Sequence, residues 1–163
     1  MLKDRLQNAM NNQITHEFYS AYLYLSMSAH FEAGSLPGMA RWMRLQAAEE
    51  QAHALKLFDY VNARNGRVTL QQIPQPPADF GTPKAAFDQV LKHEQEVTTL
   101  ITQLYELAAV EKDYAAQGML QWFITEQVEE EKHAGEIVET FKMVGESPMA
   151  LMMLDRQLGS RTG

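Results

Sequence analysis

Cysteine is absent from this 163-residue chain. Its absence excludes disulfides, thiolate-bound zinc and iron–sulfur clusters, because each of these needs cysteine sulfur. Any metal ion would therefore have to be held by the oxygen and nitrogen atoms of carboxylates and histidines. Glycine and proline are also scarce, with 9 and 6 residues, and 45% of the residues are hydrophobic. This composition is typical of a folded globular protein.

Long apolar runs are missing too, and no basic segment followed by an apolar one opens the chain. The sequence therefore predicts no membrane span and no export signal, and we expect a cytoplasmic protein. Positive charge is in deficit, with 14 Lys and Arg against 21 Asp and Glu and a formal net charge of −7. Because nucleic-acid binding needs a concentrated basic face, this balance argues against a nucleic-acid partner.

Helix start and stop signals predict four long helices and a short fifth one. They span residues 3–32, 36–65, 83–110, 113–144 and 147–158. The last four each begin beside a residue whose side chain can cap free backbone N–H groups. These residues are Ser35, Thr82, Asp113 and Ser147. A length of 163 residues suits one hydrophobic core, so we expect a single domain over residues 1–163.

One connection is much longer than the others. Residues 66–81 contain Pro74, Pro76 and Pro77, which favour an extended chain. About sixteen extended residues reach roughly 50 Å, whereas a helix of about 28 residues is roughly 42 Å long. The connection can therefore run along the whole bundle, which makes the second and third helices parallel. The sequence predicts an all-α four-helix bundle with one long crossover loop and a short fifth C-terminal helix.

Each long helix carries an apolar stripe that is interrupted by an acid near its middle. Glu17, Glu94 and Glu130 lie on the first, third and fourth stripes, and the second stripe carries Glu50 and His53. An unpaired buried carboxylate costs about several kcal/mol. Four of them would rival the whole stability of a domain, about 5–15 kcal/mol. We therefore expect these side chains to surround two metal ions.

The two halves of the chain repeat the spacing of these polar residues. Counting 77 residues on from Glu17, Glu50 and His53 gives Glu94, Gln127 and Glu130. The repeat indicates two helical hairpins related by a pseudo-two-fold axis. His133 follows Glu130 in a second Glu-x-x-His string, but its helical phase is about 100° from the stripe centre. Glu130 is therefore favoured as a ligand, and His133 is interpreted as a flanking residue.

These residues resemble the ferroxidase centre of bacterial non-haem ferritins, and the resemblance extends over nearly the whole chain. It implies the ferritin-like fold, with Glu17, Glu50 and His53 holding one iron. It also implies that Glu50 bridges to a second iron held by Glu94 and Glu130, with Gln127 nearby. A possible third iron position is implied as well. Its ligands would be Glu130 together with Glu49, Glu126 and Glu129.

Tyr24 matches a tyrosine that can supply an electron beside the centre in this family. It also lies one heptad beyond Glu17, so helical phase alone brings it near. A core aromatic with a satisfied hydroxyl is the other interpretation of Tyr24. Glu126 and Glu129 likewise have a second interpretation, as part of a solvated helix face.

The resemblance implies oxidation of Fe(II) by O2 or H2O2, followed by storage of a ferric mineral inside a hollow homo-oligomeric shell of twenty-four subunits. Haem is not expected, because Ala52 stands where a bacterioferritin carries its haem-ligating methionine. A metal-binding structural shell without iron oxidation is the alternative. A di-metal oxidase acting on an organic substrate is a third possibility, which would require a pocket open to solvent.

Overall fold

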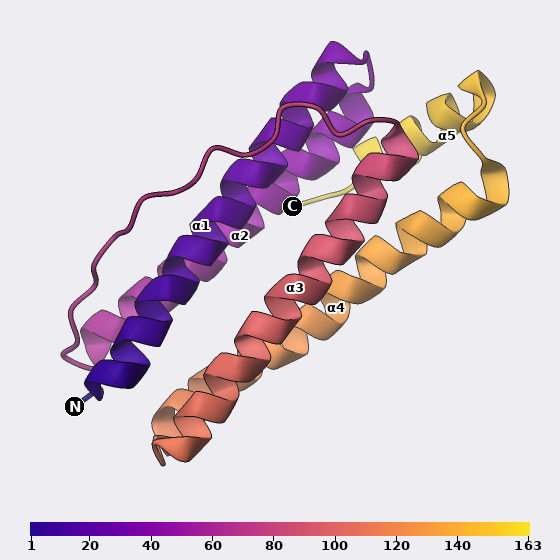
Figure 1. Cartoon of the computed structure of the whole chain (residues 1–163). Coiled ribbons are helices and arrows are strands. Elements are labelled where there is room, and N and C mark those ends of the chain that lie inside the picture. Colours follow the sequence, from indigo (N-terminus) through magenta and orange to yellow (C-terminus); the bar gives the residue numbers. More distant parts are fainter.

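The computed structural model describes all 163 residues and consists of five α-helices without strands (Figure 1). Their bounds are α1 Asp4–Ala33, α2 Pro37–Ala63, α3 Pro83–Val110, α4 Tyr114–Val144 and α5 Pro148–Gly159. The predicted all-α fold class is confirmed. The largest difference from the expected bounds lies at the end of α2, which stops at Ala63 and not at residue 65. None of the helices has the length and apolar character that crossing a membrane requires.

Side-chain caps start three of the helices. Thr82, Asp113 and Ser147 each accept a hydrogen bond from the backbone N–H three residues further on. These bonds satisfy N–H groups that have no partner inside the helix. The predicted cap at Ser35 is wrong. Ser35 has a left-handed φ of 58° in the tight turn after α1, and Leu36 takes the N-cap position of α2 without a side-chain cap.

The crossover loop runs along α1 from one end of the bundle to the other (Figure 1). At the start of the loop, the Asn11 side chain donates to the Arg67 carbonyl at 2.9 Å, and near its end Ser26 donates to the Pro77 carbonyl. Because the loop returns the chain to the end where α2 began, α2 and α3 run parallel, while α1–α2 and α3–α4 are antiparallel hairpins (Figure 1). This is the predicted one-crossover topology.

A layer of buried polar residues divides the core into two apolar clusters. One cluster has 18 buried residues, including Phe31 and Phe87, and the other has 13, including Ile14 and Ile101. Along every long helix the chain passes from one cluster to the other at the level of the predicted ligands. The apolar clusters can hold the four helices in place on either side of this layer, so the polar side chains are positioned by packing above and below them.

The short helix α5 packs against the beginning of α2. Asp155 accepts a hydrogen bond from the Met39 backbone N–H at 2.8 Å. Gly38 faces the same segment so closely that an added Cβ would lie 1.8 Å from the Asp155 carbonyl oxygen. The docking of α5 fixes the direction in which the last residues of the chain leave the bundle, and they run back along α2 (Figure 1).

Candidate metal centre

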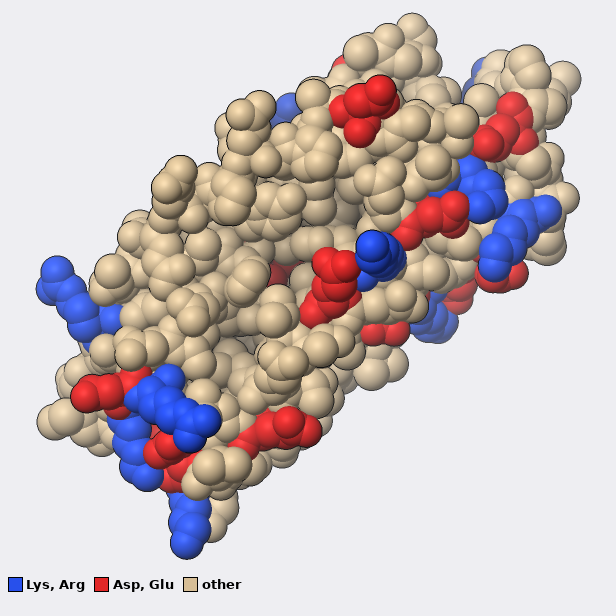
Figure 2. Space-filling view, in the orientation of Figure 1, with Lys and Arg blue, Asp and Glu red and all other residues tan.

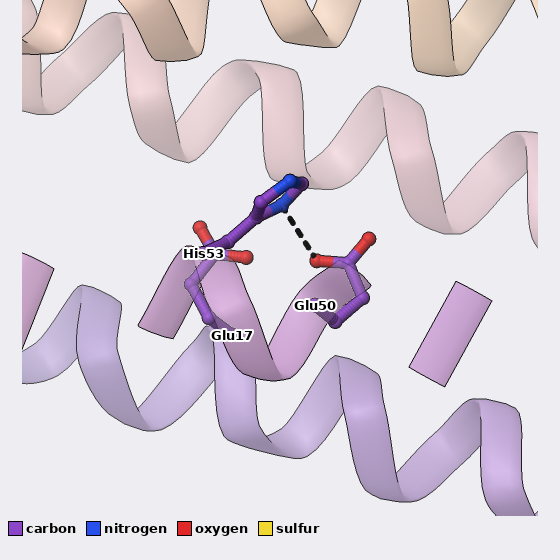
Figure 3. Close-up of side chains that lie close together, drawn as sticks. All are labelled: Glu17, Glu50 and His53. Carbon is purple, nitrogen blue, oxygen red and sulfur yellow. Dashed lines mark ion pairs between the residues drawn. The ribbon is translucent and has the colours of Figure 1, made fainter. Parts of the chain in front are cut away.

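Four helices contribute buried ionisable side chains to one region between the two apolar clusters. No member of this set is more than 6% exposed. The set consists of Glu17 on α1, Glu50 and His53 on α2, Glu94 on α3 and Glu130 on α4. Figure 3 shows the first three turned toward one another across the α1–α2 interface. The heptad phase of each helix brings its acid inward, as the apolar stripes predicted.

Two of the three groups of possible ligand atoms share Glu50. One group is Glu17, Glu50 and His53, and the other is Glu50, Glu94 and Glu130. Within each group, one ligand atom from every residue lies within 4.8 Å of the others, a spacing that could hold a metal ion. Glu50 therefore lies between two candidate metal positions. The first contains a histidine and the second is all carboxylate, so the positions are chemically unequal.

Two carboxylate oxygens in this region have no hydrogen-bond partner, Glu17 Oε2 and Glu50 Oε2. Glu50 Oε2 lies 3.3 Å from His53 Nδ1, a contact without a hydrogen bond that Figure 3 draws as a dashed line. A buried carboxylate oxygen without a partner costs about 1–3 kcal/mol or more. A divalent cation is a suitable partner, since carboxylate oxygen and imidazole nitrogen are ligands of first-row metals. The residues present therefore fit a metal ion.

Burial and mutual repulsion raise the pKa values of these carboxyl groups. Burial raises the pKa of Glu17 well above its ordinary range, and the charge of Glu50 raises it further. Burial also raises the pKa of Glu50, with Glu94 and Glu130 adding to the effect. The pKa of Glu130 rises to about 7, first through burial and then through Glu94. Without a cation, the centre is therefore poised to hold protons, which a metal ion would displace.

Two glutamines that the sequence analysis did not identify donate hydrogen bonds to candidate ligands. Gln13 donates to Glu17 Oε1 at 2.8 Å, and Gln46 donates to Glu130 Oε2 at 2.7 Å. Gln13 precedes Glu17 by one helical turn, and Gln46 has the same relation to Glu50, to which it also donates at 3.4 Å. This i,i+4 spacing on α1 and α2 is the signal that could have found them. Such bonds orient ligands before the metal arrives.

Glu94 receives two further donors. Tyr24 donates its phenolic O–H to Glu94 Oε1, and Gln127 donates to Glu94 Oε2 at 3.2 Å. Tyr24 is fully buried. Gln127 turns its amide nitrogen toward Glu94, so in this arrangement it supports a candidate ligand. His93 on α3 packs edge-on against the Tyr24 ring at 5.8 Å and pairs with the Ser20 hydroxyl.

An acidic pocket of about 360 Å³ opens beside Glu130, between α2 and α4. Its lining contains no hydrophobic residue and consists of Glu49, Glu126, Glu129, Glu130, His133, Arg161 and Thr162. All three acids predicted for the third position lie here. Glu126 also forms a group of possible ligands with His53 and Glu130. His133 is exposed on the pocket wall and belongs to none of the candidate ligand groups.

The chain matches known proteins along nearly its full length. Residues 7–144 match the family model described as a ferritin-like domain. A protein named bacterial non-heme ferritin from Bacteroides fragilis is 42% identical over 161 residues, which cover 99% of this chain and 100% of that protein. One of the same name from Staphylococcus aureus is 35% identical over 162 residues, covering 99% and 98%. An open pore ferritin from the archaeon Archaeoglobus fulgidus superposes with a TM-score of 0.98 at 46% identity, covering 99% of this chain and 100% of that one.

Proposed function

The chain belongs to the ferritin family, and we propose that it oxidises Fe(II) to Fe(III) at the centre between its four helices and stores the product as a ferric mineral. Fe(II) is the substrate in this proposal. Glu17, Glu50 and His53 bind one ion, and Glu94 and Glu130 bind the second. The observation that carries the proposal is the position of Glu50, which belongs both to the group with Glu17 and His53 and to the group with Glu94 and Glu130. It also has a buried oxygen without a hydrogen-bond partner.

Two Fe(II) ions bound side by side can together supply the two electrons that each reduction step of O2 or H2O2 requires. Each Fe(II) gives up one electron, so two Fe(II) reduce one O2 with two protons to H2O2. Two further Fe(II) reduce H2O2 with two protons to water. The carboxylates favour Fe(III) over Fe(II), because hard, negatively charged oxygen ligands stabilise the higher charge. Gln13, Gln46 and Gln127 hold these carboxylates in place by their hydrogen bonds.

The acidic pocket is the exit from this centre in the proposal. Glu130 belongs both to the second ligand group and to the pocket lining. Glu49, Glu126 and Glu129 together with Glu130 supply the third iron position there, next to the two-ion centre. A ferric ion leaving the centre would pass from one set of carboxylates to the next without crossing an apolar barrier.

Storage requires a hollow assembly, and we assign this chain to a shell of twenty-four subunits. The exposed surface supports contacts between copies. Figure 2 shows few charged side chains over α1 and the crossover loop, while acidic and basic side chains mix elsewhere on this face. Tyr22, Leu25 and Leu70 are exposed in that area by 52%, 43% and 64%. The particle mass in solution tests the assembly, and a monomer would contradict storage in a shell.

Mixing the metal-free protein with Fe(II) and O2 tests the oxidation directly. We expect a fast phase of Fe(III) formation that buffer alone lacks, with two Fe(II) consumed per O2 in the first turnover. The iron should then co-migrate with the protein on a sizing column. If zinc binds and stabilises the protein while iron is oxidised no faster than in buffer, the metal-binding shell without oxidation is the correct function.

Replacing Tyr24 with phenylalanine tests the role of its hydroxyl. The change keeps the buried ring but removes the hydrogen bond to Glu94. Loss of a bond that orients a metal ligand costs about 10–100-fold in affinity or activity. We expect oxidation to be about tenfold slower. We also expect a tyrosyl radical signal in frozen samples of the parent taken during oxidation, and no such signal in Tyr24→Phe. Tyr19→Phe is the matched control. Tyr19 lies on α1, as Tyr24 does, and its ring is also near His93, but its hydroxyl makes no hydrogen bond to the carboxylates. Equal rates for Tyr24→Phe and the parent would remove Tyr24 from the reaction.

A further inference from the structure

The last residues of the chain bring a guanidinium group to the acidic pocket. Arg161 follows α5, and its Nη2 donates to Glu49 Oε2 at 2.7 Å. Its Nη1 donates to Gln46 Oε1 at 2.9 Å, and the group lies 4.7 Å from the centre of the Trp42 ring. The side chain is only 20% exposed. Arg161 is therefore held by three partners on α2 and is not a loose terminal residue.

Arg161 is the only lysine or arginine in the lining of this pocket, where it faces four glutamates. Its guanidinium offsets part of their mutual repulsion, which falls off slowly in a partly buried site. Glu49 is the glutamate it holds, and Glu49 is also one of the acids assigned to the third iron position. The guanidinium occupies Glu49 Oε2, and its positive charge disfavours a metal cation on the same carboxylate.

We propose that Arg161 is a tethered cation that competes with a metal ion for Glu49, so that the pocket accepts its ion only as the guanidinium leaves. The proposal rests on the proposed function for the place of the third ion. Its chemistry, an arginine exchanging with a metal cation on a shared carboxylate, is independent of iron oxidation. Arg161 acts here as a positioning residue, since its partners Glu49, Gln46 and Trp42 belong to neither of the two ligand groups that share Glu50.

The hydrogen bonds of Gln46 connect this exchange to the centre. A guanidinium can only donate, so the amide oxygen of Gln46 must face Arg161. The amide nitrogen then faces the carboxylates, where it donates to Glu130 Oε2 at 2.7 Å. When Arg161 leaves, it releases Glu49 for the third ion and also removes the partner that keeps Gln46 turned toward Glu130. Entry of an ion into the pocket thus weakens the hydrogen bond by which Gln46 orients Glu130 in the centre.

Calorimetric titration with Zn²⁺, which is redox-inactive, tests the competition in the assembled protein. We expect two ions per subunit to bind tightly in the parent and a third to bind weakly. In Arg161→Gln the third ion should bind roughly tenfold more tightly, because the guanidinium no longer occupies the Glu49 carboxylate. Arg161→Lys keeps the charge and should stay within about threefold of the parent. Arg156→Gln removes an exposed arginine of α5 and should leave all three affinities unchanged.

A double variant locates the effect. In Glu49→Gln the competition for this carboxylate is already gone, so adding Arg161→Gln should no longer tighten the third ion. A chain that ends at Ser160 gives a second removal of the guanidinium and should reproduce the Arg161→Gln result. The proposal is overturned if the third zinc ion binds no more tightly to Arg161→Gln and to the shortened chain than to the parent. It is also overturned if Arg156→Gln tightens the third ion as much as Arg161→Gln does. Slow iron oxidation in a parent that shows the predicted zinc pattern would overturn only the proposed function.

Discussion

Replacing Glu50 with alanine should abolish the fast phase of Fe(II) oxidation. Glu50 is the only residue that belongs both to the group with Glu17 and His53 and to the group with Glu94 and Glu130. Its loss therefore removes a ligand from both candidate positions at once. Removing even a partner of a metal ligand costs about 10–100-fold, so we expect the initial rate to fall by at least about 100-fold. Stopped-flow absorbance of Fe(III) measures this rate.

Glu96→Ala is the matched control for this change. Glu96 carries the same charge and lies two residues after Glu94 on α3, but it is exposed and belongs to no ligand group. Its rate should equal that of the parent. His53→Ala should remove the histidine-containing position and leave the all-carboxylate one. If Glu50→Ala oxidises iron as fast as the Glu96 control, the assignment of the centre is wrong.

The second large effect is a reversal of the pH dependence of stability when metal is removed. Burial raises the pKa of Glu130 from its ordinary value of 4.5 to about 7, and the pKa values of Glu17, Glu50 and Glu94 are raised as well. Between pH 4.5 and about pH 7, the folded protein therefore binds more protons than the unfolded chain. Its free energy of unfolding must therefore fall as the pH rises from about 4.5 to above 7. For Glu130 alone the loss is on the order of 3 kcal/mol.

Bound metal should cancel this loss, because the cation replaces the protons and binds better as the carboxyl groups ionise. Thermal unfolding of the metal-free protein should show a melting temperature that decreases from pH 5 to pH 8. The zinc-loaded protein should show no decrease, or a rise. A melting temperature of the metal-free protein that rises with pH over this interval would mean that the buried acids are compensated by something other than protons.

Glu130→Gln separates this effect from general instability. Glutamine has nearly the same shape, carries no charge and can still accept the hydrogen bond from Gln46. At pH 8 the metal-free variant should melt about 5–10 °C higher than the parent, as expected for about 2–3 kcal/mol in a chain of this size. It should gain less from zinc, since the second position has lost a ligand. Glu136→Gln, an exposed change on the same helix, should alter neither property.

Most of the fold follows from local chemistry. The caps at Thr82, Asp113 and Ser147 act within one helical turn, so the sequence alone places the starts of α3, α4 and α5. The exception, Ser35, lies in a turn between α1 and α2. There the geometry of the whole hairpin sets its φ of 58°, and its own capping preference does not decide the structure.

The candidate ligands were predicted because they break apolar stripes, and a stripe reports which side of a helix is buried. Glu17, Glu94 and Glu130 each interrupt a stripe where burial without a cation would be costly. The repeat of their spacing then indicated two helical hairpins that carry these residues in matching positions. The partners of these acids were harder to predict, because glutamines are common and the i,i+4 spacing of Gln46 from Glu50 does not show that its amide also reaches Glu130 on α4.

By itself, the sequence determined the five helices, the direction of the crossover, the buried acids and the absence of any thiolate chemistry. These depend on residue type and on spacing within one helix. Only the tertiary structure decided that Gln46 turns its amide toward Glu130 and that Arg161 reaches Glu49. The place of Glu50 between two groups of ligands was implied by the family resemblance and did not follow from spacing within one helix. Arg161 and Glu49 lie far apart in the chain. Periodicity shows which face of a helix is covered, whereas the residue that covers it depends on how distant segments pack.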